Sequence, residues 1–164
     1  MSLQYPLRAC WMKRGHQTHL PLSNRHRDFQ HVFGALNWRT DTVCYTTAIH
    51  KNSQTFIEFL EHLLLECYPA QSVILVMDNA AYHHAAQTRA ALSLFEHRLR
   101  IVWLPAYCPE LNPIERFWRH LKDLALANHL FHSVDELLAS LDLILSAQND
   151  PSSSLRLSFL KDFQ

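Results

Sequence analysis

Two kinds of hydrophobic pattern alternate along the chain and predict a mixed α/β fold. Runs rich in β-branched and aromatic residues at 31–37 and 42–49 predict two strands, with 37–41 as a hairpin turn. Continuous apolar runs at 72–77 and 100–104 predict strands that are covered on both faces. The order, a hairpin followed by α-β-α-β-α-α, is typical of a mixed sheet flanked by helices.

Helical periodicity fills the segments between and after these strands. Four helices are expected: from a cap at Asn52 or Ser53 to before Pro69, over 84–97, from about Pro113 to Asn128, and from the Ser133–Glu136 capping box to about Gln148. Residues 1–28 show little periodicity and predict a loop with at most one short strand. We therefore expect one domain over 1–150, followed by a C-terminal tail at 151–164.

Composition agrees with a single globular domain. The chain has 164 residues, of which 48% are hydrophobic and 18% charged, enough to bury a core. Its two glycines exclude a Gly-rich phosphate loop. No apolar run reaches the length of a membrane span and no signal-peptide pattern is present, so we expect a cytoplasmic location and no membrane partner.

Cysteine and histidine positions give little support to a disulfide framework or a zinc site. The four cysteines are scattered without a C-x-x-C pair, which predicts reduced, mostly buried thiols. His83 and His84 are adjacent, and neighbouring residues do not share one helical face.

Charge is balanced overall but uneven in its distribution. Formal net charge is zero, yet the segment 8–39 is strongly basic, with Asp28 as its single acid. Its cations are Arg8, Lys13, Arg14, Arg25, Arg27 and Arg39. This pattern suits a phosphate-contacting face, and a solvated loop explains it equally well.

Two carboxylates stand where catalytic groups are found in α/β proteins. Asp78 follows a predicted buried strand, and functional groups collect at such strand ends. Glu115 lies in the opening turn of a predicted helix. Carboxylates from different elements are the ligands that Mg²⁺ prefers, and two such ions can drive phosphoryl transfer. The pair therefore suits a divalent-metal site acting on a phosphodiester.

Each carboxylate also has a purely structural interpretation. An Asp after a strand commonly caps the following turn or helix. With Asn112 as N-cap and Pro113 at the first helical position, Glu115 falls at N3, the reciprocal position of a capping box. The structural and catalytic roles are compatible with each other.

Two motifs together resemble the catalytic domain of Tc/mariner-type DDE transposases, especially the bacterial insertion-sequence branch. They are DNAAYH at 78–83 and LPAYCPELNPIERFW at 104–118, of which the Asn-Pro-Ile-Glu element is the more specific. VFGAL at 32–36, RACW at 8–11 and KRG at 13–15 are similar to that branch as well. The resemblance covers about residues 7–145.

The resemblance implies an RNase H-like fold with a mixed five-stranded sheet and helices on both faces. It implies an acidic triad that binds two Mg²⁺ or Mn²⁺ ions, cleaves transposon ends, and joins the freed 3′-hydroxyl to target DNA. Asp78 would be the second acid and Glu115 the third. The motif positions Asn79, His83, Asn112 and Pro113 would support them.

The first acid of the family pattern has no match. It would lie on the first, central strand, shortly before Arg8, yet no acid occurs in residues 1–27. Asp28 and Asp41 fall in a loop and a turn. A helix-turn-helix region is missing as well. We therefore expect a partial catalytic domain, incomplete as encoded, from a decayed remnant, a split reading frame or a misplaced start codon.

Two main functions follow. The chain is either a DNA-cleaving and strand-joining transposase domain, active once the missing strand is restored, or an inactive fragment that inhibits by binding DNA or pairing with transposase subunits. A general RNase H-like nuclease is a weaker alternative, because the Asn-Pro-Ile-Glu context is typical of transposases. Expected partners are transposon-end and target DNA, and a second copy, full-length transposase or the product of an upstream reading frame.

Overall fold

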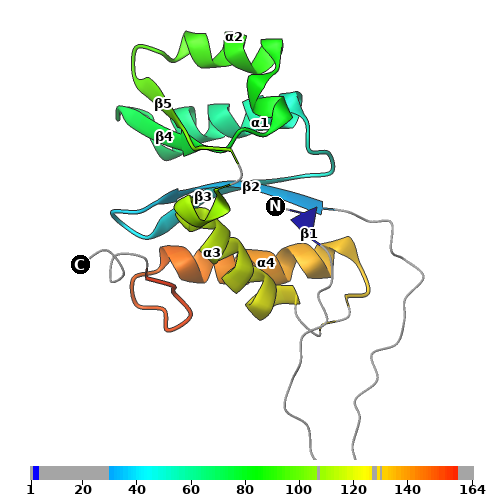
Figure 1. Ribbon diagram of the computed structural model, residues 1–164. Helices are drawn as coiled ribbons and strands as arrows, with labels where there is room; N and C mark the ends of the chain where they lie inside the picture. Colours follow the sequence, from blue (N-terminus) through cyan, green and yellow to red (C-terminus); the bar gives the residue numbers. More distant parts are fainter. Residues whose placement is uncertain (1, 4–29, 107, 127–128, 130, 159–164) are drawn as a thin grey trace, which may run out of the picture.

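The computed structural model describes residues 2–3, 30–106, 108–126, 129 and 131–158. Its central feature is the hairpin of β2 (Gln30–Asn37) and β3 (Thr42–Ala48), with helices on both sides (Figure 1). The helices α1 (Ser53–Glu61) and α2 (Ala86–Leu94) lie on one side. On the other side lie α3 (Pro113–Leu121) and α4 (Val134–Asn149). The predicted α/β class with flanking helices is confirmed.

The hairpin forms where the sequence predicted it. Its strands are antiparallel from His31 opposite Ala48 to Asn37 opposite Thr42. The turn ends at Asp41, which adopts a φ of 56° and is nevertheless buried. Asp tolerates this left-handed conformation better than most residues. The Asp41 carboxylate accepts a hydrogen bond from Ser158, and the Asp41 carbonyl accepts one from Gln148 of α4. These two bonds connect the turn to α4 and to the segment that follows it.

Neighbouring residues of the hairpin enter different cores because side chains alternate across a strand. Val32 packs with α3 and α4 in a first core, in which Phe117, Leu121 and Leu141 are fully buried. Phe33 packs with α1 in a second core, where its ring lies 6.2 Å from that of Phe59. The hairpin is therefore covered on both faces.

Helix α1 shows how local signals set an element's start. Asn52 accepts a hydrogen bond from the Thr55 amide, and the Thr55 hydroxyl lies 3.2 Å from the Asn52 amide, which completes a capping box. The helix then widens into a π-helix over His62–Cys67 and ends before Pro69, as predicted. The predicted cap at Ser133 is also confirmed, since its hydroxyl accepts from the Glu136 amide at the start of α4.

Strands β4 (Val73–Met77) and β5 (Leu99–Trp103) form a separate parallel pair. Leu75 and Met77 of β4 face the second core. Ile74 is 69% exposed and Val76 45% exposed, so the prediction that β4 is covered on both faces is wrong. The prediction for β5 is wrong as well, because Val102 is 47% exposed. Among the described residues, no layer covers this second face of the pair.

The five described strands make two sheets instead of the single mixed sheet that the resemblance implied. The short β1 (Ser2–Leu3) runs antiparallel to β2, and it pairs there with His31 and Gln30. Farther along the same edge of β2, over 33–37, the described part of the chain offers no second strand. The edge of β4 that faces away from β5 likewise has no described strand partner.

Helix α3 contacts the hairpin at Gly34 of β2, where the Trp118 ring packs against the strand. A Cβ at Gly34 would lie 2.6 Å from Cη2 of Trp118, closer than real Cβ contacts. A side chain at position 34 would therefore force the Trp118 ring, or the helix that carries it, to shift. After α3 the chain widens into a second π-helix, Lys122–Leu126. The buried residues of α3 and of this π-helix all belong to the first core.

One cysteine prediction is wrong. Cys44 of β3 and Cys67 at the end of the first π-helix form a disulfide, with a Cα–Cα distance of 6.5 Å. Spacing along the sequence could not indicate this pair, because the second core brings the two residues together in space. Cys108 is the free cysteine of the described chain, and Cys10 lies outside the described residues. No described helix is both long and apolar enough to cross a membrane.

Candidate active site

Asp78 stands at the carboxyl end of β4 and turns the chain there. Its Oδ1 accepts a hydrogen bond from the Ala80 amide at 3.1 Å, the turn-capping role that the sequence allowed. The side chain remains 57% exposed. A carboxylate has several acceptor sites, so capping leaves Asp78 able to bind a further group.

His83 fixes the conformation of the Asp78 turn. Its ring is buried 4.3 Å from the rings of both Phe56 and Tyr82. Its Nδ1 lies 3.0 Å from the Asp78 carbonyl oxygen and 3.0 Å from Oδ1 of the same residue. Because both neighbours are oxygens, Nδ1 carries the proton and donates.

Burial lowers the pKa of His83, and the hydrogen bond and charge of Asp78 oppose that shift. The ring is therefore a neutral donor near neutral pH. His83 therefore contacts both the backbone and the carboxylate of Asp78.

Asn79 ties the ends of the two parallel strands together. Its Nδ2 donates to the Leu104 carbonyl at 2.6 Å, directly after β5. Its Oδ1 lies 3.2 Å from Nε2 of His84, whose ring stacks on Trp103 at 4.4 Å. The loop that follows β4 is thus attached to β5, which holds Asp78 in place.

Glu115 comes from the first turn of α3. Asn112 is the N-cap and Pro113 opens the helix, as predicted. The predicted capping box is absent, because the Asn112 side chain makes no capping hydrogen bond. Within the described chain, no group hydrogen-bonds or pairs with the Glu115 carboxylate. Glu115 is exposed and unengaged there, so the structural explanation for this residue fails.

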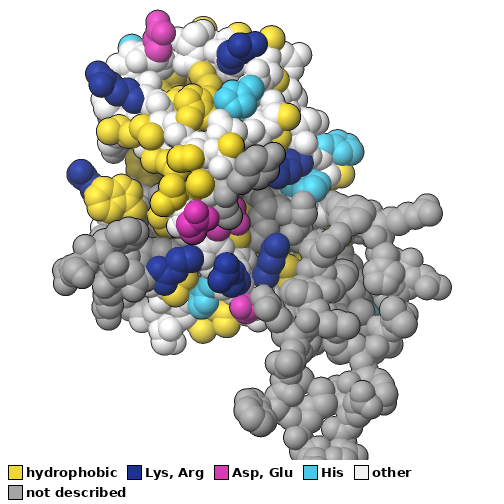
Figure 2. Space-filling view, viewed as in Figure 1, with side chains coloured by type: hydrophobic (Ala, Val, Ile, Leu, Met, Phe, Trp, Pro, Cys, Tyr) yellow, Lys and Arg dark blue, Asp and Glu magenta, His cyan; other side chains and the backbone are white. Residues whose placement is uncertain are grey.

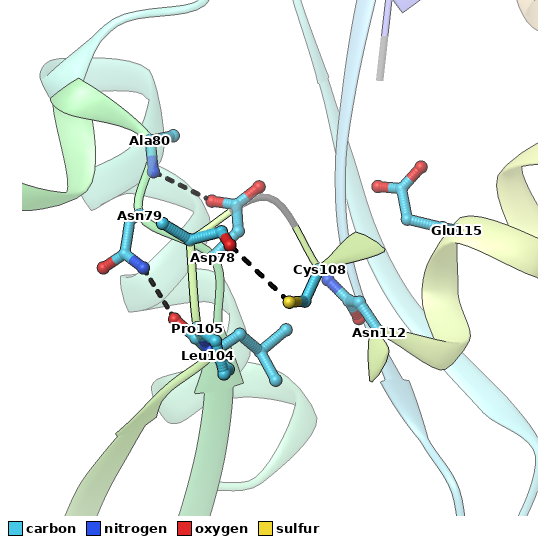
Figure 3. A pocket seen from close by; sticks show the side chains of 9 residues that line it. Asp78, Asn79, Ala80, Leu104, Pro105, Cys108, Asn112 and Glu115 are labelled. Carbon is cyan, nitrogen blue, oxygen red and sulfur yellow. Dashed lines mark hydrogen bonds between the residues drawn. The ribbon is translucent and has the colours of Figure 1, made fainter. Parts of the chain in front are cut away.

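The structure brings the two carboxylates to one pocket of about 350 Å³. Asp78 reaches it from the end of β4, and Glu115 from α3 on the opposite side (Figure 3). The remaining lining residues are Asn79, Ala80, Leu104, Pro105, Ala106, Cys108 and Asn112. The pKa of Tyr82 is raised by burial first, and then by the negative charges of Asp78 and Glu115. Both carboxylates therefore act electrostatically on the same neighbourhood.

A basic face lies next to this pocket on α3, and sequence reasoning missed it. Figure 2 shows Lys and Arg side chains gathered beside acidic ones. Arg116 and Arg119 are exposed and Lys122 is partly exposed, at a spacing of three that places them near one another on the helix. The spacing of three, which is visible in the sequence, is the signal that predicts this basic face.

The N-terminal cations proposed for DNA contact, Arg8, Lys13, Arg14, Arg25 and Arg27, lie outside the described residues. Arg39, from the same cluster, is exposed at the hairpin turn with its guanidinium 5.5 Å from the Trp38 ring. Asp41, one of the two alternatives for the first acid, is buried under the C-terminal segment and does not line the pocket. Asp28 lies outside the described residues.

Comparison with known proteins shows the family of the chain. A family described as DDE superfamily endonuclease matches residues 1–138. The chain belongs to this family. The resemblance to Tc/mariner-type DDE transposases is thereby confirmed, and an insertion-element relative and transposase structures support it further.

Among curated relatives, the insertion element IS630 uncharacterized 39 kDa protein of Shigella sonnei is 29% identical over 130 residues. That match covers 79% of this chain and 37% of the relative. Uncharacterized protein y4pE/y4sA of Sinorhizobium fredii is 22% identical over 108 residues, or 66% of this chain and 76% of that protein.

The fold is shared with Mos1 transposase. Its paired-end complex with left transposon end gives a TM-score of 0.70 at 21% identity, covering 92% of this chain and 47% of Mos1. The Mos1 strand transfer complex gives 0.68 at 21% identity, covering 90% and 45%. The RNase H-like fold class is therefore confirmed. The chain spans less than half the length of the Shigella relative and of Mos1.

Proposed function

We propose that this chain is a portion of a DDE transposase catalytic domain that cleaves transposon-end DNA and transfers the freed strand into target DNA. The observation that carries the proposal is the meeting of Asp78 and Glu115 at one pocket, each within its family motif. The Mos1 structures, a paired-end complex with a transposon end and a strand transfer complex, support DNA as the substrate class.

The family implies a divalent metal, and the residues present fit one. Asp78 is 57% exposed while its backbone is fixed, and Glu115 is not engaged in capping its helix. Two exposed carboxylates with an amide nearby form an oxygen donor set of the kind Mg²⁺ or Mn²⁺ prefers. When bound, such ions activate the attacking oxygen and stabilise the leaving one. We propose Asp78 and Glu115 as ligands, with Mg²⁺ or Mn²⁺ as the ion.

The remaining motif residues position these ligands. His83 donates to Asp78 from a buried ring, and Asn79 links the loop to β5. Asn112 and Pro113 begin α3 so that Glu115 falls in its first turn. Arg119 of α3 and Lys122, which directly follows that helix, supply positive charge beside the pocket for the DNA backbone. The N-terminal cations 8–27 remain part of this proposal.

We also propose that catalysis needs a further strand carrying a third acid. The support is the split sheet: β2 lacks a described partner over 33–37, and the outer edge of β4 lacks one as well. A strand that continued β1 on its N-terminal side would run along that edge of β2, since the two are antiparallel. An upstream polypeptide or a longer form of the chain would supply it.

The test is metal-dependent nicking of double-stranded DNA that carries the ends of the element encoding this chain. The chain is produced with the residues encoded upstream, fused or co-expressed. We expect nicking with Mg²⁺ or Mn²⁺ and its loss in Asp78→Asn and Glu115→Gln. Glu96→Gln, an exposed site between α2 and β5, serves as the matched control. Retained nicking in Asp78→Asn would refute the assignment.

A second candidate is a non-catalytic fragment that pairs with transposase or covers DNA. It is favoured by the exposed apolar side chains of Ile74 and Val76 on β4, whose outer edge has no partner among the described strands. Such edges readily pair with other chains. This function predicts co-purification with full-length transposase, or salt-sensitive DNA binding, without cleavage under any metal condition.

A further inference from the structure

A second group of metal-ligating side chains lies away from the Asp78–Glu115 pocket. It combines Cys44 of β3 with His62 and Cys67, the first and last residues of the π-helix. One ligand atom from each residue lies within 4.8 Å of the other two. Cys44 is buried, and the other two are partly exposed. None of the three lines the pocket or belongs to the transposase motifs.

The π-helix explains why two of these residues converge. His62 and Cys67 are five positions apart, and in an α-helix such residues point about 140° away from each other. A π-helix forms i→i+5 hydrogen bonds, so residues five apart lie one above the other. Nε2 of His62 is accordingly 3.5 Å from Sγ of Cys67. Single-turn π segments occur frequently at functional sites.

Glu66 orients the histidine. Its Oε2 lies 3.0 Å from Nδ1 of His62, which leaves Nε2 directed at the cysteine sulfur. A carboxylate that accepts from one ring nitrogen is the usual support of an imidazole that binds metal through the other. The cluster therefore contains both ligands and a residue that positions one of them.

We propose that Cys44, His62 and Cys67 form a Zn²⁺ site when the disulfide between the two cysteines is reduced. Two electrons and two protons, supplied by a thiol reductant, convert that disulfide into two thiols. Zn²⁺ then displaces the two thiol protons and binds the thiolates together with neutral Nε2. A fourth position stays open to water.

The ligand atoms of Cys44, His62 and Cys67 determine which kind of metal ion this site prefers. Thiolate and imidazole select zinc over Mg²⁺, whereas the carboxylates of the pocket prefer the harder ion, so the two sites should not compete. The bound ion would join β3 to the π-helix across the second core, where the disulfide otherwise joins them. The site is independent of the proposed cleavage.

The test is the zinc content of the whole chain, purified with a thiol reductant and without chelator, by elemental mass spectrometry. We expect about one zinc per chain, in line with one three-ligand site. Replacement by Co²⁺ should give the near-ultraviolet sulfur-to-cobalt absorption of thiolate ligation. Cys44→Ser, Cys67→Ser and His62→Asn should lose the metal. Cys108→Ser and His97→Gln, which alter residues of the same types outside the cluster, should retain it. Glu66→Gln should weaken zinc affinity by about 10- to 100-fold.

A second measurement uses the native chain, so it tests the site even if the variants fail to fold. In the native zinc-bound chain, Cys44 and Cys67 should resist alkylation and become modified once a chelator is added, as located by peptide mass spectrometry. The inference is overturned if the reduced chain holds no zinc, if zinc persists in both cysteine variants, or if Cys44 and Cys67 remain disulfide-bonded under reducing conditions.

Discussion

The β2–β3 hairpin and the β4–β5 pair are both hydrophobic two-stranded units, yet they differ in how they are covered. The hairpin contributes to two cores, one on each face. The β4–β5 pair contributes to one core and leaves Ile74 largely exposed on the other face. The candidate catalytic carboxylate Asp78 follows the less covered unit, and Glu115 comes from a helix packed on the better covered one.

This difference separates stability from function. Substitutions in the β2–β3 hairpin, or in the two cores that cover its faces, should change the free energy of unfolding strongly. Substitutions on the exposed face of β4–β5 should change the free energy of unfolding little, because among the described residues no element packs on that face.

Removing a fully buried ring from the first core should have the largest effect. Phe117 of α3 is 0% exposed, so Phe117→Ala should lower the free energy of unfolding by about 3–5 kcal/mol. Urea denaturation measures the change. Leu94→Ala on α2, where the side chain is 73% exposed, is the matched control and should stay within about 0.5 kcal/mol. Equal losses in both variants would show that burial in the first core does not set the size of the effect.

Filling the contact between α3 and the hairpin should come next. Gly34→Ala places a Cβ 2.6 Å from Trp118, and overpacking of this kind lowers stability by about 1–3 kcal/mol. The same denaturation assay applies. Because α3 carries Glu115, metal-dependent cleavage should also fall. The double variant Gly34→Ala with Trp118→Leu should recover part of the stability, and failure to recover any would argue against this contact.

His83 should give the region around β4 a pH dependence of modest size. Its pKa is lowered in the folded chain from the ordinary 6.5, chiefly by burial. Between the lowered value and 6.5 the unfolded chain binds more protons at this residue, so the contribution to stability falls as the pH drops below about 6.5. Thermal unfolding at several pH values should show this fall in the native chain and a flatter profile in His83→Gln. Identical profiles would contradict the buried, neutral ring.

The smallest effect is expected on the open face. Ile74→Thr and Val76→Thr remove apolar surface that is already exposed, so each should change stability by no more than about 0.5 kcal/mol. If a further strand or partner covers this face, both variants should instead weaken its association, as measured by co-purification or by complementation of cleavage. A loss of stability near that of Phe117→Ala would show that this face is buried in the chain itself.

Features set by neighbouring residues were the ones that the sequence predicted well. The hairpin, the Asn52 and Ser133 caps and the start of α3 all depend on a few adjacent side chains. The motifs predicted Asp78 and Glu115 as site residues, and in the structure both line one pocket.

Features set by distant residues were missed. The exposure of β4 depends on which elements lie over it, and its apolar run is the same whether one face or two are covered. The Cys44–Cys67 pair depends on the packing of β3 against the π-helix. The absent capping box at Glu115 shows that the right residue spacing does not ensure the hydrogen bond, since the Asn112 side chain makes none at the helix start.

A metal site shared by the two carboxylates can be tested by titrating the chain with Mn²⁺ and measuring the binding by electron paramagnetic resonance. If Asp78 and Glu115 hold one ion together, then Asp78→Asn and Glu115→Gln should each weaken binding, and the double variant should be scarcely weaker than either single one, because the shared ligand set is already broken. Glu96→Gln should bind as the native chain does. Unchanged Mn²⁺ affinity in both single variants would show that Asp78 and Glu115 do not bind the ion.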